Sequence, residues 1–199
     1  MLNEISLLGQ SSSWLEVIAM LTGILGVWLT MKQNPLCFPV GIINVSLYAW
    51  LFFSPGIRLY ADALLQCIYI LLLIYGWYKW TIKEKSSALL PIRIGRRNSM
   101  QAGALVFAGT IVLAFFLQTQ TDASYPWLDS ALTCFSLAAQ WMIARKMIEN
   151  WIVWIVVDIV YLPLYIIKGL PLTALLYFIF LLLAIRGYVD WKKQLVYER

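Results

Sequence analysis

Long apolar runs, each long enough to cross a lipid bilayer, dominate this 199-residue sequence. A transmembrane helix needs about 20 consecutive apolar residues, within a range of roughly 17–25. Seven segments meet this requirement, and polar or turn-forming residues separate them. A transmembrane β-barrel would instead alternate polar and apolar residues over strands of about ten residues. The sequence therefore predicts an all-α integral membrane protein with helices at 13–31, 36–53, 59–80, 100–118, 127–146, 150–167 and 171–190.

Composition supports the membrane assignment and disfavours several kinds of chemistry. Hydrophobic residues make up 62% of the chain and charged residues only 13%, against about 45–50% and 25% in soluble domains. Histidine is absent and the cysteines occur singly, at Cys37, Cys67 and Cys134. Zinc sites, haem–histidine ligation and Ser-His-Asp catalysis are therefore not expected. We expect no cofactor, no metal and no enzymatic activity. The first residues, MLNEISLLGQSSS, also lack the pattern of a removable signal peptide.

The Lys and Arg residues predict an orientation in the membrane. Cytoplasmic loops carry an excess of these residues. With the N-terminus outside, thirteen of them fall at inner helix ends and loops, and only Arg58 and Lys168 fall outside. The net charge of +5 is thereby explained by topology, without nucleic-acid binding. We expect the N-terminus outside and the C-terminus in the cytoplasm.

The two ends of the chain resemble each other. SWLE at 13–16 matches PWLD at 126–129, and GWYKW at 76–80 matches GYVDW at 187–191. ALLQ at 63–66 likewise matches ALLY at 174–177, and Asn44 falls opposite Asp158 within one residue. Each repeat would hold three helices. A single additional span between them makes the two repeats parallel, which is the 3+1+3 plan of SWEET-like transporters, with a substrate site between the repeats near the membrane midplane.

This plan divides the chain into five parts. They are a periplasmic N-terminus (1–12), a first three-helix bundle (13–80), a cytoplasmic loop with the linker helix (81–118), a second bundle (119–191) and a cytoplasmic tail (192–199).

Asp158 is the one charged residue in the apolar run from Trp151 to Ile167. A carboxylate at this depth costs at least ~2.5–3.5 kcal/mol on insertion scales, so it calls for a functional reason. Trp151, Trp154 and Asp158 follow the spacing i, i+3, i+7, which places them on one helix face. Two indoles and a carboxylate on one face suit a flat cationic aromatic ligand.

Other polar residues at membrane depth are further candidates for the substrate site. Asn44 and Tyr48 share a face of their span, as do Asp62 and Gln66, and Thr133 and Gln140, while Tyr177 falls opposite Gln66 in the repeat. Several structural alternatives remain open. Trp151 is close enough to the inner end to be an interfacial anchor. Asn44, Thr133 and Gln140 could instead bond neighbouring helices. Asp62 could pair with Arg58, and a neutral Asp158 could bond a tyrosine.

The motifs YAD-x₃-Q (60–66), YGWY-x-W (75–80) and RK-x₂-ENW-x₂-W (145–154) resemble those of the PnuC family of bacterial vitamin transporters, and the likeness runs from about Trp14 to Lys192. The resemblance implies a homotrimeric cytoplasmic-membrane protein with a SWEET-type fold that takes up nicotinamide riboside for NAD biosynthesis. Some branches of the family carry thiamine or nucleosides instead. Transport would be facilitated diffusion, with a cytosolic kinase trapping the product. The absence of a GxxxxGK[ST] phosphate loop agrees with this.

Carried onto this chain, the family's ligand contacts imply a substrate site built from both repeats. Several relatives have Asn where this chain has Asp158, so the substrate stays open between nicotinamide riboside and thiamine. A SWEET-like sugar transporter or small channel is a further alternative, and an intramembrane enzyme a remote one. The implied substrate-binding residues are Asn44, Tyr48, Gln66, Gln140, Trp151, Trp154, Asp158 and Tyr177.

Overall fold

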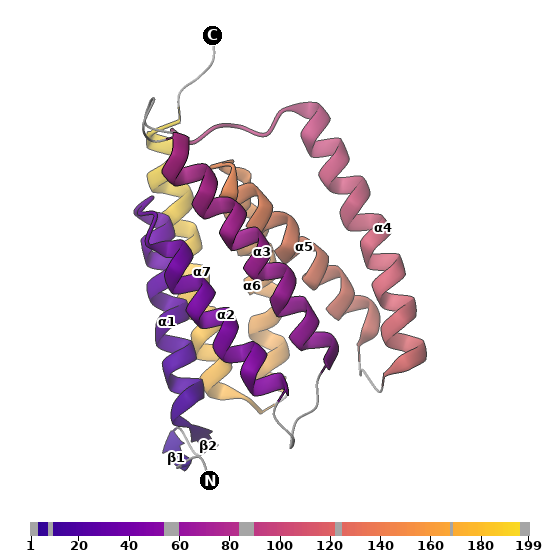
Figure 1. Cartoon of the computed structure of the whole chain (residues 1–199). Coiled ribbons are helices and arrows are strands. Elements are labelled where there is room, and N and C mark those ends of the chain that lie inside the picture. Colours follow the sequence, from indigo (N-terminus) through magenta and orange to yellow (C-terminus); the bar gives the residue numbers. More distant parts are fainter. Residues whose placement is uncertain are drawn as a thin grey trace.

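The computed structural model describes residues 4–7, 10–53, 60–83, 90–121, 125–167 and 169–195. Within these ranges seven helices follow a short antiparallel hairpin (Figure 1). The hairpin pairs β1 (Glu4–Leu7) with β2 (Gln10–Ser13), and the sequence analysis did not foresee it. The prediction of seven helices is confirmed. They are α1 (Trp14–Met31), α2 (Cys37–Phe53), α3 (Tyr60–Lys83), α4 (Arg96–Gln120), α5 (Pro126–Ala144), α6 (Glu149–Ile167) and α7 (Pro171–Lys193).

The helix ends differ from the predicted spans mainly where charged residues extend a helix. The helix α3 continues to Lys83, and α4 begins at Arg96 rather than at residue 100, because a helix can project beyond the apolar layer. Among the described residues, α4, α6 and α7 are long and apolar enough to cross a membrane. Shorter apolar segments lie at Val17–Met31 and Cys37–Trp50. These helices are those of a multi-pass membrane protein.

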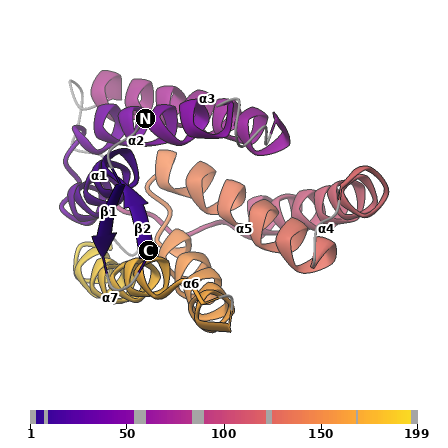
Figure 2. The same ribbon diagram turned by 90° about the horizontal axis from the view of Figure 1, so that it is seen from below.

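Six of the helices form a closed ring, in the order α1, α2, α3, α5, α6, α7 and back to α1. The helix α4 stands outside this ring and packs on α5, as the view along the helices makes clear (Figure 2). The first three and the last three helices of the chain thus supply the two halves of the ring. Any space inside it is therefore bounded by helices from both halves of the chain.

The turns α1–α2 and α5–α6 have the same backbone geometry. Gln33 and Lys146 are the two non-glycine residues with positive φ in the described part of the chain, at 54° and 53°. Each donates its backbone N–H to the residue three positions earlier, Thr30 or Ile143, at 2.9 Å. Left-handed backbone is uncommon outside glycine, so its recurrence at matching positions of the two sequence repeats extends their similarity to the backbone.

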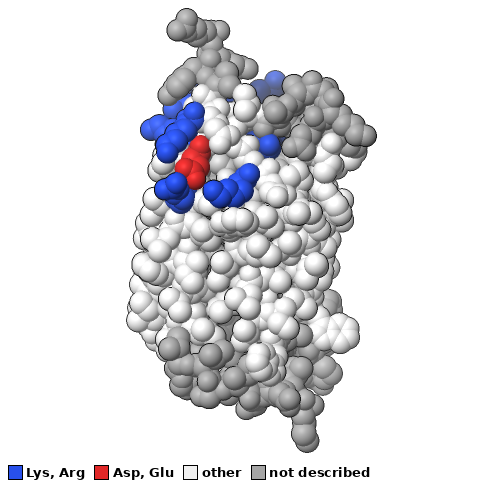
Figure 3. Space-filling model, turned by 90° about the vertical axis from the view of Figure 1, so that its left-hand side faces the viewer, with Lys and Arg blue, Asp and Glu red and all other residues white. Residues whose placement is uncertain are grey.

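Basic side chains gather at the end of the molecule where α1, α3, α5 and α7 finish. Figure 3 shows Lys and Arg near this end, with a broad uncharged belt beside it on the face drawn. We call it the basic end. A strap formed by residues 90–95 crosses it: Ile92 exchanges backbone hydrogen bonds with Lys146 and Ile148 at 3.0 and 2.9 Å, and Ile94 N–H donates to Glu149 Oε2 at 2.9 Å. The strap thereby fixes the start of α4 to the α5–α6 turn.

Candidate substrate cavity

A cavity of about 250 Å³ lies inside the helix ring. All six ring helices contribute to its wall, and the peripheral α4 does not. Ligand pockets in proteins are typically about 300–1,000 Å³, so this one suits a compact small molecule. The lining residues are Thr22, Gly23, Gly26, Val27, Thr30, Cys37, Phe38, Gly41, Asn44, Val45, Gln66, Tyr69, Leu73, Gln140, Ile143, Trp151, Trp154, Asp158, Phe180 and Ala184.

Six of the eight residues that the sequence analysis selected line this cavity, and two do not. The helix α2 contributes Asn44, α3 contributes Gln66 and α5 contributes Gln140. The helix α6 contributes Trp151, Trp154 and Asp158 from one face. Tyr48 and Tyr177 are absent from the lining, as is Thr133; the side chain of Asp62 and all of Arg58 lie outside what the structure describes.

Asp158 is the one charged side chain among the described residues that line the cavity. Only 2% of its surface is exposed. Within the described residues no side chain or backbone group forms a hydrogen bond or ion pair with it, and the lining holds no Lys or Arg. A buried carboxylate without a protein partner is costly. The cavity therefore presents an acceptor that a ligand can satisfy.

Trp151 is an interior residue, which argues against its being an interfacial anchor. Its exposed fraction is 1%, and its indole Nε1 has no hydrogen-bond partner in the part of the chain that the structure describes. The ring packs edge-on against Trp191, with centroids 5.4 Å apart. Gly187 of α7 lies against the indole so closely that a Cβ there would be 2.7 Å from Cε2 and Cζ2. The absence of a side chain at Gly187 thus allows Trp151 to occupy this position.

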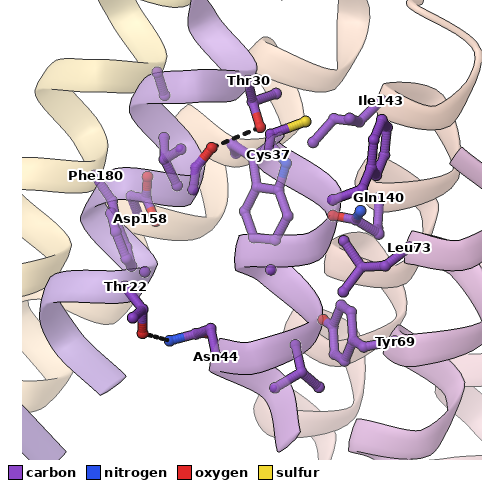
Figure 4. A pocket seen from close by; sticks show the side chains of 18 of the residues that line it. Thr22, Thr30, Cys37, Asn44, Tyr69, Leu73, Gln140, Ile143, Asp158 and Phe180 are labelled. Carbon is purple, nitrogen blue, oxygen red and sulfur yellow. Dashed lines mark hydrogen bonds between the residues drawn. The ribbon is translucent and has the colours of Figure 1, made fainter. Parts of the chain in front are cut away.

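The amide side chains of Asn44 and Gln140 occupy different parts of the cavity wall. Asn44 Nδ2 donates to the Ala19 carbonyl and to Thr22 Oγ1, the latter at 3.1 Å, so Asn44 also ties α2 to α1. Gln140 and Tyr69 lie on the opposite side of the cavity from Asp158 and Phe180 (Figure 4). A ligand between these two sides would meet a carboxylate on one and an amide and a phenol on the other.

Tyr177 belongs to an aromatic cluster beside the cavity. Its ring lies 4.9 Å from that of Tyr161 and 5.0 Å from that of Tyr165. It also lies 5.9 Å from Phe180, which does line the cavity. The rotation of α7 turns Phe180 inward and Tyr177 toward α6. Repeat matching gave no information on this rotation, and it did not identify Phe180.

An aromatic floor closes the cavity toward the basic end. It consists of Phe38, Trp80, Trp151 and Trp191, whose neighbouring ring centroids are 5.0 to 6.2 Å apart. Trp80 Nε1 donates to the Ile143 carbonyl at 3.2 Å, and Trp191 Nε1 to the Met31 carbonyl at 3.1 Å. Each bond joins the last helix of one half to the end of the first helix of the other, so the two bonds form a reciprocal latch between the halves.

Lys146 lies directly beneath the aromatic floor. Its Nζ is 4.4 Å from the centroid of the Trp80 ring and donates to Gln33 Oε1 at 3.3 Å. Gln33 Nε2 in turn donates to Gln194 Oε1 at 2.7 Å. This polar layer adds a second set of contacts between the halves. Within the ranges that the structure describes, no group of three His, Cys, Asp or Glu side chains could hold a metal ion.

Comparison with known proteins agrees with a membrane transporter. The family model described as nicotinamide mononucleotide transporter matches residues 13–193. The chain is 28% identical over 210 residues to the nicotinamide riboside transporter PnuC of Escherichia coli K12, covering 92% of this chain and 87% of that protein. It is 28% identical over 200 residues to PnuC of Neisseria mucosa, covering 91% and 73%.

Two further similarities concern substrate and fold. The riboflavin/roseoflavin transporter RibM of Streptomyces davaonensis is 24% identical over 189 residues, covering 93% of this chain and 87% of that protein. A crystal structure of the vitamin B3 transporter PnuC superimposes with a TM-score of 0.71 at 27% identity, covering 91% of this chain and 81% of the other.

Proposed function

Because this chain belongs to the PnuC family, which the nicotinamide mononucleotide transporter model describes, we propose that it imports nicotinamide riboside. The observation that carries the proposal is Asp158, the single charged group among the described residues of the cavity wall. It shares a face of α6 with Trp151 and Trp154. The carboxylate attracts the positive pyridinium ring, and indole faces attract a flat cation by stacking and cation–π contact. Asn44, Gln66 and Gln140 offer hydrogen bonds to the carboxamide and ribose.

The charge of the cavity favours the riboside over its phosphorylated form. A phosphate monoester carries a charge of about −1.5 to −2 at pH 7. The described residues that line the cavity include no Lys or Arg to pair with the phosphate, and Asp158 would repel it. The cargo is therefore a nucleoside rather than a nucleotide. Phosphorylation after entry would prevent it from returning through the same cavity.

Riboflavin is a second candidate, because RibM, a riboflavin/roseoflavin transporter, is among the relatives. Riboflavin has three fused rings and a longer polyol chain, whereas nicotinamide riboside has one ring and a compact sugar. A cavity of about 250 Å³ favours the smaller molecule. Thiamine is also a flat cation, so Asp158 and the two indoles do not separate it from the riboside.

The transport cycle that we propose is alternating access by facilitated diffusion. The 3+1+3 plan predicted from the repeats is supported by the matching turns at Gln33 and Lys146 and by the position of α4 outside the helix ring. In this plan the two halves rock against each other around the cavity. The aromatic floor and the latch close the basic end, so their opening would release cargo there. The sequence has no phosphate loop, and trapping would need a separate cytosolic kinase.

The chain is a bacterial multi-pass membrane protein, and we propose that its basic end faces the cytoplasm, with the N-terminus outside. The gathering of Lys and Arg at that end supports this orientation. Residues 1–12 would then be periplasmic and 192–199 cytoplasmic. We also propose a homotrimer, as the family resemblance implies. A fluorescent protein fused to the C-terminus should be fluorescent in the cytoplasm, and light scattering in detergent should give three times the 22.9 kDa chain mass.

Direct binding and transport measurements test the cargo. Purified protein should bind nicotinamide riboside and exchange labelled riboside across proteoliposomes without an ion gradient or ATP. Nicotinamide mononucleotide should not compete. Tight binding of thiamine or riboflavin with none for the riboside would overturn this assignment. Competition by the uncharged reduced riboside as strong as by the oxidised one would instead indicate a site that ignores ring charge, as in a sugar transporter.

A further inference from the structure

The cavity wall formed by α1 consists of small residues. Thr22, Gly23, Gly26, Val27 and Thr30 face the cavity along one side of this helix. The two threonine hydroxyls turn back to their own helix: Thr22 Oγ1 donates to the Ile18 carbonyl at 2.8 Å and Thr30 Oγ1 to the Gly26 carbonyl at 2.9 Å. The wall is therefore smooth and mainly apolar, and backbone is exposed to the cavity at the glycines.

The three glycines that line the cavity differ in what a side chain would meet. At Gly41 an added Cβ would be 3.0 Å from Leu73 Cδ2, and at Gly23 it would be 3.3 Å from Phe180 Cζ. Close packing between helices explains both. At Gly26 the nearest atom would be Val40 Cγ1 at 3.8 Å, which is an ordinary van der Waals distance. Packing alone would therefore accept alanine at position 26.

A helix interior disfavours glycine by about 1 kcal/mol relative to alanine, so Gly26 has a cost that its packing does not require. Its counterpart at the 113-residue offset of the repeat, which also relates Trp28 to Trp141, is Ala139. Ala139 is fully buried and lies outside the cavity lining. At this repeat position the first half has a glycine that lines the cavity, Gly26, and the second half has a buried alanine, Ala139. Glycine commonly permits the close approach of a ligand to backbone.

We propose that Gly26 is the residue that sets the upper size limit of the cargo, because it lets the cargo lie directly against the backbone of α1. The inference rests on the proposed function in one respect, that the cargo occupies this cavity. It does not depend on which flat vitamin the cargo is.

The experiment compares Gly26→Ala and Gly26→Val with Gly103→Ala. Gly103 lies on α4, away from the cavity, and a Cβ there would meet nothing within 4 Å. Riboside affinity should fall about tenfold for Gly26→Ala and further for Gly26→Val, while Gly103→Ala binds as wild type. The melting temperature of Gly26→Ala in detergent should equal or exceed that of wild type. Wild-type affinity in both Gly26 variants, or an affinity loss accompanied by lower stability in Gly26→Ala, overturns the proposal.

A second readout needs no cargo. Cys37 lines the same cavity, and in a Cys67→Ser/Cys134→Ser background it is the remaining thiol. Gly26→Val should slow the labelling of Cys37 by fluorescein maleimide more than by the smaller N-ethylmaleimide. An equal effect on both reagents contradicts the size limit. If wild type binds riboflavin and not the riboside, the proposed function fails, and the graded loss at Gly26 is then measured with riboflavin.

Discussion

Gln33 and Lys146, which are 113 residues apart, share the same left-handed backbone conformation and are joined by a hydrogen bond from Lys146 Nζ to Gln33 Oε1 at 3.3 Å. The two turns that the repeat makes equivalent therefore meet each other at the basic end. Directly above them, Trp80 and Trp191 form their reciprocal bonds to the opposite halves. These polar contacts between the halves all lie on the same side of the cavity, where they bear on its opening.

Removing the indole donors of the latch should favour the state that is open toward the basic end. Each Trp→Phe change at position 80 or 191 removes one hydrogen bond between the halves, at a cost of about 1 kcal/mol, so the double variant should shift the equilibrium by about tenfold or more. Cys37 in the Cys67→Ser/Cys134→Ser background should then react faster with a maleimide. Trp127→Phe is the control, because Trp127 Nε1 donates to Gln118 Oε1 away from the latch. Equal acceleration in the control would rule out the latch.

Bound cargo should protect Cys37 from the same reagent. The thiol lines the cavity together with Asp158 and Trp154, so a riboside in that space blocks access to it. Labelling in the double-serine background should slow as riboside concentration rises, with a midpoint at the dissociation constant measured independently. Adding Cys37→Ser to this protein removes its last thiol and measures the labelling that does not occur at Cys37. Protection that does not saturate, or none at all, would place the cargo elsewhere.

Asp158→Asn should weaken binding of the cationic riboside by about tenfold to a hundredfold, since a hydrogen bond to a charged group contributes about 1.5–3 kcal/mol. The uncharged reduced riboside should be affected much less. Isothermal titration of both ligands measures the difference. Asp129→Asn is a matched control, because Asp129 lies in the first turn of α5 and outside the cavity lining. Unchanged affinity for the cation would mean that Asp158 acts only as a hydrogen-bonding group.

Gly187→Ala should destabilise the protein by about 1–3 kcal/mol, because the added methyl group would lie 2.7 Å from two atoms of the Trp151 ring. The melting temperature in detergent should fall, while Gly103→Ala on α4 should leave it unchanged or raise it. Combining Gly187→Ala with Trp151→Phe should restore much of the stability, since the smaller ring makes room. Riboside affinity should be lower in the double variant than in wild type, because the Trp151 indole is gone. If the losses of stability from Gly187→Ala and Trp151→Phe simply add in the double variant, the added methyl group does not clash with the Trp151 ring.

The lengths of the apolar runs and helical periodicity predicted much of this molecule. The seven helices follow from the lengths of the apolar runs, and the shared face of Trp151, Trp154 and Asp158 follows from 3.6 residues per turn. The inward position of Phe180 could not be predicted in the same way, because it depends on how α7 rotates against its neighbours. The wall formed by α1 gave no signal, since glycine and threonine at that spacing resemble ordinary transmembrane sequence.

The strap at Ile92 and Ile94 changes how the seven helices divide mechanically. It fastens the segment before α4 to the α5–α6 turn, and α4 itself packs on α5. The linker helix is therefore carried by the second half and is not a free connection between two equal bodies. In the rocking cycle that we propose, the two moving parts are therefore unequal, with α1–α3 in one and α4–α7 in the other.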